Sequence, residues 1–181
     1  MQHRDLDIFD RIVSWQKHGK KVALATVLST WGSAPRVVGS FLAVNVSGEF
    51  CGSVSGGCVE AAVVSECQQA MTLGQPRILE YGVTDDEAFE VGLACGGTIR
   101  ILIEPFESSD NIPRECLAAL QERKHRVLAR ELSQKTPFGG GWRYWLSHES
   151  AAGLKNNGYI DPNQEIFGSV FVPDIRVLIV G

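Results

Sequence analysis

One candidate for chemistry is a cysteine that directly follows a glycine-rich loop. Cys58 comes after Ser55, Gly56 and Gly57, where an apolar pattern of helical spacing begins. Unpaired N–H groups and the positive end of the helix dipole favour a thiolate there, which makes the sulfur more nucleophilic and a better ligand for a soft metal. The N–H groups of Ser55, Gly56 and Gly57 also form a cradle suited to a phosphate. The alternative, a glycine-rich turn with a buried and inert cysteine, stays open.

A second loop repeats this arrangement. The run Gly92-Leu93-Ala94-Cys95-Gly96-Gly97 places one thiol between glycines, after an acidic segment and before a predicted strand. If the two loops converge, Cys58 and Cys95 jointly face a bound ligand; otherwise each glycine only permits a tight turn. The other three cysteines are predicted to be structural, and all five are expected to be reduced thiols because their number is odd and no Cys-x-x-Cys pair occurs.

A third loop carries the best candidate for binding an anion. It runs from Thr30 to Arg36 and contains one proline and one cation. The planar guanidinium of Arg36 can grip a phosphate or a carboxylate in two places. A surface salt bridge is the alternative role for Arg36, and a capping-box contact is the simplest role for Glu60. The four histidines are scattered, so we predict neither a zinc site nor a Ser/His/Asp triad.

The elements that hold these loops can be predicted from apolar spacing. A helix is expected to open the chain and to stop near Gly19, and Val46-Ser47-Gly48 is expected to be the turn of a hairpin. Further helices are predicted over residues 58–73 and 113–124. Strands are predicted over residues 21–30, 41–45, 49–51, 77–83, 98–106, 125–132, 142–146, 165–172 and 175–180.

The composition excludes two classes of protein. The 181 residues carry 17 Lys and Arg against 21 Asp and Glu, a net charge of −4, with no basic run. A nucleic-acid-binding protein needs a basic face, so no such partner is expected. The chain also lacks the roughly 18 consecutive apolar residues that a membrane span requires, and its N-terminus lacks a signal core. We therefore expect no membrane span and a cytoplasmic location.

The last eight residues suggest the start of another domain. Residues 174–181 form a buried-type strand that ends in one glycine, as the first strand of a dinucleotide-binding unit does. Because a central parallel strand without its crossover helix would stay unpaired, the chain is expected to be the front portion of a longer protein. The fold class predicted is α/β: a mixed sheet with flanking helices, followed by the truncated start of a Rossmann-like domain.

Taken in order, the three loops resemble the N-terminal domain of the xanthine dehydrogenase accessory (XdhC/CoxI) family. The motifs are Gly32-Ser33-Ala34-Pro35-Arg36 with Gly39, Gly52-Ser53-Val54-Ser55-Gly56-Gly57-Cys58-Val59-Glu60, and Gly92-Leu93-Ala94-Cys95-Gly96-Gly97. The resemblance implies an XdhC/CoxI-type domain over residues 1–106, a connecting region of uncertain assignment over 107–173, and the first strand of a truncated Rossmann-like domain over 174–181.

The resemblance implies a maturation chaperone for molybdenum hydroxylases. Family members are thought to bind the molybdenum cofactor transiently, hold it during sulfuration by a cysteine desulfurase, and insert it into an apo xanthine dehydrogenase-type enzyme. By position, Arg36 and the backbone of Ser55, Gly56 and Gly57 would take the phosphate or the pterin. Cys58 or Cys95, with Gly96 beside it, would lie near molybdenum or carry sulfur. The resemblance also allows for a homodimer and for a nucleotide in the absent C-terminal domain.

Two other functions compete with the chaperone. In one, the chain is a cysteine-dependent or NAD(P)-dependent enzyme that uses the glycine-loop cysteine or the C-terminal Rossmann domain. No histidine is placed as a base for the first, and no pyrophosphate loop is present for the second. In the other, the chain is a structural or regulatory α/β domain with glycine turns. The accessory role, without enzymatic turnover, is the expected one.

Overall fold

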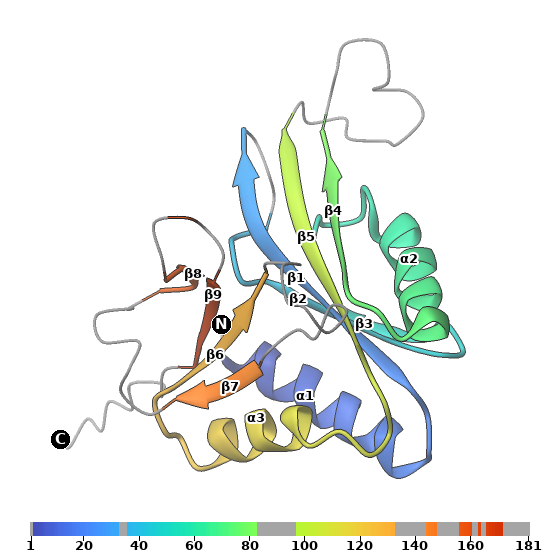
Figure 1. Cartoon of the computed structure of the whole chain (residues 1–181), viewed down its shortest axis with the longest axis vertical. Helices are drawn as coiled ribbons and strands as arrows, with labels where there is room; N and C mark the ends of the chain where they lie inside the picture. The colour runs from blue at the N-terminus through green and yellow to red at the C-terminus, as the bar shows by residue number, and fades with distance from the viewer. Residues whose placement is uncertain are drawn as a thin grey trace, which may run out of the picture.

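Two antiparallel sheets and three helices make up the part of the chain that the structure, a computed structural model, describes. That part comprises residues 2–32, 36–82, 97–132, 144–147, 156–160, 163 and 166–171. One sheet has five strands in the order β3-β2-β1-β5-β4, and the other has four in the order β7-β6-β9-β8 (Figure 1). Every strand pair among these residues is antiparallel.

The five-stranded sheet is centred on two long strands. These are β1 (Val22–Trp31) and β5 (Thr98–Phe106), and β2 (Phe41–Asn45), β3 (Phe50–Gly52) and β4 (Arg77–Tyr81) complete the sheet. Side chains along a strand alternate between its two faces, so β1 and β5 can be apolar on both only if both faces are covered. Their burial patterns show that they are: seven consecutive residues of β1 are buried.

Helix α2 (Glu60–Leu73) covers one face of this sheet. Val63, Cys67, Ala70 and Met71 recur at helical spacing and pack on alternate residues of β1, β2 and β5, such as Ala25. The helix ends at Gly74, whose φ of 64° is the left-handed conformation that glycine adopts without strain. At its other end, α2 begins just after the loop that contains Ser55, Gly56 and Gly57, so this loop is attached to a helix that packs on the sheet.

Two helices and the second sheet cover the opposite face. They are α1 (Gln2–Lys17), α3 (Ile112–Gln121) and the strands β6 (Arg126–Glu131), β7 (Tyr144–Ser147), β8 (Gly158–Tyr159) and β9 (Ile166–Phe171). Phe9 of α1 makes T-shaped ring contacts with Phe41 of β2 and Phe171 of β9, and its ring centroid lies 5.6 Å from each of theirs. One apolar cluster thus joins α1, α3 and both sheets.

A buried ion pair also joins the two sheets. The Nε of Arg130, on β6, donates to both carboxylate oxygens of Glu104, on β5, at 3.0 and 2.8 Å. Both side chains are fully buried. Arg130 Nη1 donates to Ser169 Oγ at 2.7 Å, while Nη2 is buried without a partner among the described residues. Because water does not reach either charge, each one compensates for the loss of hydration of the other.

The expected α/β class, with helices flanking a sheet, is confirmed. The hairpin turns at Gly48, with a φ of 81°, and the opening helix stops before Gly19. The parallel pairing that a mixed sheet contains is not among the described strands, and β8 was not predicted. The region of uncertain assignment, residues 107–173, contains α3 and the strands of the second sheet. The predicted domain boundaries and the strand at 174–181 stay predictions. No helix of the described residues is long and apolar enough to span a bilayer.

Candidate functional site

The carboxylate of Glu60 is the centre of the predicted glycine loop, which we call the Ser53–Glu60 loop. It accepts hydrogen bonds from six donors, and the residue is 9% exposed. The backbone donors are the N–H groups of Val54, Ser55, Gly56 and Gly57, at 3.2, 2.9, 3.0 and 2.7 Å. The other two are the hydroxyl groups of Ser53, at 2.7 Å, and Ser55. The loop is therefore an anion site whose anion belongs to the chain itself.

Two serines extend this network beyond the carboxylate. Ser53 Oγ accepts from Arg36 Nε at 3.1 Å and from the Gly56 N–H at 3.0 Å while it donates to Glu60. Ser55 Oγ donates to Glu60 and accepts from the Val59 N–H at 2.9 Å. The bond from Gly57 has the three-residue spacing of the capping box expected of Glu60, but α2 begins at Glu60 with Val59 as its N-cap, so this contact is not a capping box. Together with the other five bonds it makes the glutamate the anchor of the whole loop.

These hydrogen bonds fix the charge of Glu60. Burial raises the pKa of this carboxyl, but the bonds from Ser55, Ser53 and the loop amides outweigh it and lower the pKa from 4.5 to about 2. Glu60 is therefore ionised at neutral pH. Gly56 and Gly57, with φ of 83° and 122°, permit the backbone to turn its N–H groups inward.

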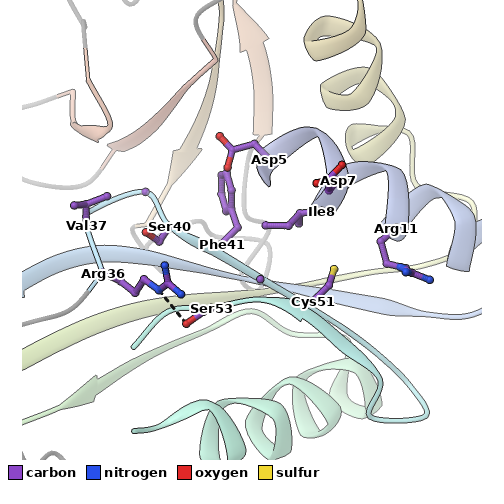
Figure 2. A pocket seen from close by; sticks show the side chains of 12 residues that line it. Asp5, Asp7, Ile8, Arg11, Arg36, Val37, Ser40, Phe41, Cys51 and Ser53 are labelled. Carbon is purple, nitrogen blue, oxygen red and sulfur yellow. Dashed lines mark hydrogen bonds between the residues drawn. The ribbon is translucent and has the colours of Figure 1, made fainter. Parts of the chain in front are cut away.

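Arg36 is connected to the loop but keeps free donors. Its Nε is bound to Ser53, and its Nη1 and Nη2 groups have no partner among the residues that the structure describes. The side chain is half-buried and lines a cavity of about 470 Å³. Figure 2 shows the guanidinium and Ser53 at one end of this cavity. A fixed guanidinium whose two Nη groups form an unused donor edge is an arrangement that binds an oxyanion.

The cavity, which we call the α1 pocket, lies between α1 and the β2–β3 hairpin (Figure 2). Asp5, Asp7 and Arg11 line it from α1, and Cys51 lines it from β3. Burial raises the pKa of Asp5 to about 6 and that of the Cys51 thiol to about 11. Ser53 lines the pocket and also binds Glu60, so the pocket and the Ser53–Glu60 loop share a wall.

The cysteines divide into exposed and buried thiols. Cys58 is exposed, Cys51 is half-buried, and Cys67 and Cys116 are buried; all four are free. The core positions predicted for Cys67 and Cys116 are thus confirmed, and the reduced state of the thiols stays a prediction. Cys95 and Gly96 lie outside the described residues, so the predicted convergence of the two cysteine loops stays a prediction. Within the described residues no three metal-ligating side chains gather in one group.

Several residues of this region were not predicted from the sequence. The sequence does contain a signal for Ser53: Ser53, Ser55 and Glu60 are polar residues in one eight-residue segment that also contains Gly56 and Gly57. Asp5, Asp7 and Arg11 have none, because their place in the same pocket as Arg36 depends on how α1 packs on the β2–β3 hairpin.

Native alkylation should separate the cysteines. Iodoacetamide is expected to modify Cys58 in the folded chain and to leave Cys67 and Cys116 unmodified until the chain is denatured, because burial raises the pKa of both of these thiols to about 12. Peptide mass spectrometry after timed quenching measures each site. Rapid native labelling of Cys67 would contradict the packing of α2 on the sheet.

The part of the chain that contains the Ser53–Glu60 loop matches a known protein family. Residues 15–82 match the model of the XdhC and CoxI family. The matched residues include β1, the β2–β3 hairpin, the Ser53–Glu60 loop and α2. The resemblance predicted from the three loops is therefore confirmed for this segment.

Individual relatives extend the match along the chain. The molybdenum cofactor insertion chaperone PaoD of Escherichia coli (strain K12) is 32% identical over 163 residues, which are 90% of this chain and 46% of PaoD. The uncharacterized protein YqeB of the same organism is 30% identical over 98 residues, which are 54% of this chain and 18% of YqeB.

A solved structure shares the fold. It is a crystal structure described as a xanthine dehydrogenase from Bacillus halodurans, with a TM-score of 0.68 and 21% identity. The match covers 93% of this chain and 53% of that one. The chain thus spans about half the length of that structure and of PaoD.

Proposed function

We propose, from the premise that residues 15–82 belong to the XdhC and CoxI family, that this chain binds the molybdenum cofactor as cargo during the maturation of a molybdoenzyme. The similarity to a molybdenum cofactor insertion chaperone along 90% of the chain supports this role. One structural observation carries it: a guanidinium with free N–H edges and an exposed thiol lie on one hydrogen-bonded loop network.

The donor set suits this cargo. The cofactor carries a phosphate and a thiophilic metal bound by sulfur, so its binding site needs an oxyanion-binding group and soft or hydrogen-bonding groups near the metal. Arg36 supplies the first through its Nη groups. Cys58 supplies the second, because it lies between Gly57 and Val59 and its thiol is exposed. The finer assignment, in which Cys58 or Cys95 contacts molybdenum or carries sulfur, belongs to this proposal.

The loop amides are already occupied by the Glu60 carboxylate. The N–H groups of Ser55, Gly56 and Gly57 donate to Glu60, so a phosphate would bind them only after Glu60 releases them. Arg36 needs no such release. We therefore assign the phosphate to Arg36 first and treat the amides as a second contact that depends on movement of Glu60.

The partners follow from the proposed role. An apo molybdoenzyme of the xanthine dehydrogenase type would receive the cofactor, and a cysteine desulfurase would supply the sulfur for its sulfuration. A second copy of this chain and a nucleotide-binding C-terminal domain belong to the same proposal, as does a cytoplasmic location. Turnover by this chain is not required for any of these steps.

Cofactor retention tests the proposal. The chain is co-expressed with an intact molybdenum cofactor pathway and purified without oxygen, and molybdenum and pterin are quantified per chain. We expect near-stoichiometric amounts in the wild type and a loss of both in Arg36→Ala and Cys58→Ala.

A matched control is Cys116→Ala, which removes a thiol buried in the core far from the loop in sequence. It should keep the cofactor as long as the chain folds. A folded wild type that carries neither molybdenum nor pterin, alone and as part of the full-length gene product, would refute the proposed function.

A further inference from the structure

The α1 pocket has an anion-binding group at one end and a carboxylate on its α1 side. We propose that this pocket holds the pterin phosphate part of the cargo, with Arg36 binding the phosphate and Asp5 binding the amino-pyrimidine edge of the pterin. The inference rests on the proposed function and adds the place and orientation of the ligand. The cavity of about 470 Å³ is lined by charged side chains of both signs.

Arg36 is prepared for a phosphate by its neighbour. Ser53 Oγ holds the Nε at 3.1 Å, so the guanidinium loses little freedom when a ligand binds its Nη groups. Ser53 is itself held by Glu60 at 2.7 Å. Glu60 already satisfies the amides of the loop, so the guanidinium is the free anion-binding group on this side of the pocket.

Asp5 offers the complementary group on α1. The amino-pyrimidine edge of a pterin presents two parallel N–H donors, the ring N–H and the amino group, in the same spacing as the edge of a guanidinium. A carboxylate accepts both at once. Asp5 is half-buried, and burial raises its pKa to about 6, so it is mostly ionised at neutral pH and poorly solvated. A poorly solvated carboxylate gains most from a ligand that donates two hydrogen bonds.

The walls suit a flat ring. Ile8 and Phe41 supply apolar surface, and the volume lies within the roughly 300–1,000 Å³ of small-molecule sites. Gly52, with a φ of 90°, lines the pocket at a point where only glycine fits, because a Cβ at this position would collide with the carbonyl oxygen of Phe41. Arg11 and Asp7 close the end of the pocket away from Arg36 (Figure 2).

Two pterins that differ only in the phosphate test the proposal. The probes are 6-hydroxymethylpterin phosphate and 6-hydroxymethylpterin, titrated into the 181-residue chain by fluorescence anisotropy. We expect Arg36→Gln to weaken the phosphate ester by about tenfold or more and to leave the phosphate-free pterin unchanged. We expect Asp5→Asn to weaken both probes by about tenfold, because the lost contact is to the ring.

Two charged residues of α1, the helix that carries Asp5, provide matched controls. Asp10→Asn and Lys17→Gln remove one negative and one positive charge at exposed positions that do not line the pocket, and both should bind like the wild type. Amide spectra locate the ligand independently: the Gly39 and Gly52 signals should shift on binding, while those of Gly19 and Gly74 should not.

The outcomes separate this proposal from the proposed function. If Asp5→Asn and Arg36→Gln bind both probes as their controls do, or if the wild type binds neither probe, the pocket assignment is wrong. Molybdenum and pterin that still co-purify with the wild type would then leave the chaperone role intact. If the probes bind as expected and the co-expressed wild type carries no molybdenum, alone and as part of the full-length gene product, the pocket is a pterin site and the chaperone role fails.

Discussion

Replacing Arg130 by methionine is expected to lower the free energy of unfolding by about 3–5 kcal/mol. The substitution leaves the carboxylate of Glu104 buried between the two sheets without its partner at 2.8 Å. Burial raises the pKa of Glu104 and the neighbouring guanidinium opposes this rise, so removing Arg130 favours protonation of this buried carboxyl. Urea denaturation followed by tryptophan fluorescence measures the loss.

The double variant Glu104→Leu with Arg130→Met should recover most of this loss, because apolar residues of similar volume replace a buried pair at little cost. Lys21→Met is the surface control: its partner Glu107 is about half exposed, so the change should cost less than about 1 kcal/mol. If the double variant is as unstable as the sum of the two single variants, the two side chains do not interact as a pair.

Elements with a clear local signal were predictable. Short continuous runs of apolar residues predict β1 and β5, and Gly48 and Gly74 mark a turn and a helix end because both have positive φ. Helix α2 begins at Glu60 rather than at Cys58, because the preceding residues are held in a loop by the Glu60 carboxylate. The helical spacing alone does not show this constraint.

The chemistry of the glycine loop was partly predictable. Consecutive N–H groups at Ser55, Gly56 and Gly57 were expected to bind an anion, and in this structure they bind a carboxylate. What the sequence does not reveal is that the carboxylate belongs to Glu60, since a glutamate three residues after Gly57 is equally consistent with a capping box. The role of the amides toward a phosphate stays a prediction.

Contacts between distant elements were not predictable. Glu104 and Arg130 each interrupt an apolar strand, and nothing in their spacing shows that the two strands face each other across two sheets. The α1 pocket likewise depends on α1 lying beside the β2–β3 hairpin, about thirty or more positions further along the chain. Such contacts follow from tertiary packing, which the local spacing of apolar and polar residues does not predict.

Replacing Glu60 by glutamine should lower the free energy of unfolding at pH 7 by about 2 kcal/mol. Glutamine keeps the shape of the side chain but carries a single acceptor oxygen. If that oxygen takes the place of Oε1, the new amino group faces the N–H of Gly57 and the hydroxyl of Ser55. Ser55 can turn its hydroxyl to accept, but the Gly57 N–H is left without an acceptor. Thermal unfolding monitored by circular dichroism measures the difference.

The effect should depend on pH in a defined direction. The folded pKa of Glu60, about 2, lies below the ordinary value of 4.5, so the carboxylate stabilises the fold fully above pH 4.5 and loses this contribution as the pH falls toward 2. Glutamine does not titrate. The stability gap between wild type and Glu60→Gln should therefore be largest above pH 4.5 and should shrink below it.

Glu115→Gln provides the control, because Glu115 also lies in the first turn of a helix but is exposed. It should change stability by less than about 0.5 kcal/mol at any pH in this range. Equal stability of Glu60→Gln and wild type from pH 7 to pH 2 would show that the carboxylate does not hold the loop. Because the oxygen at the position of Oε1 still accepts from Ser53, which holds Arg36, the same variant should bind the pterin phosphate like the wild type. Tighter binding would mean that the freed amides take the phosphate themselves, and that Glu60 competes with the ligand.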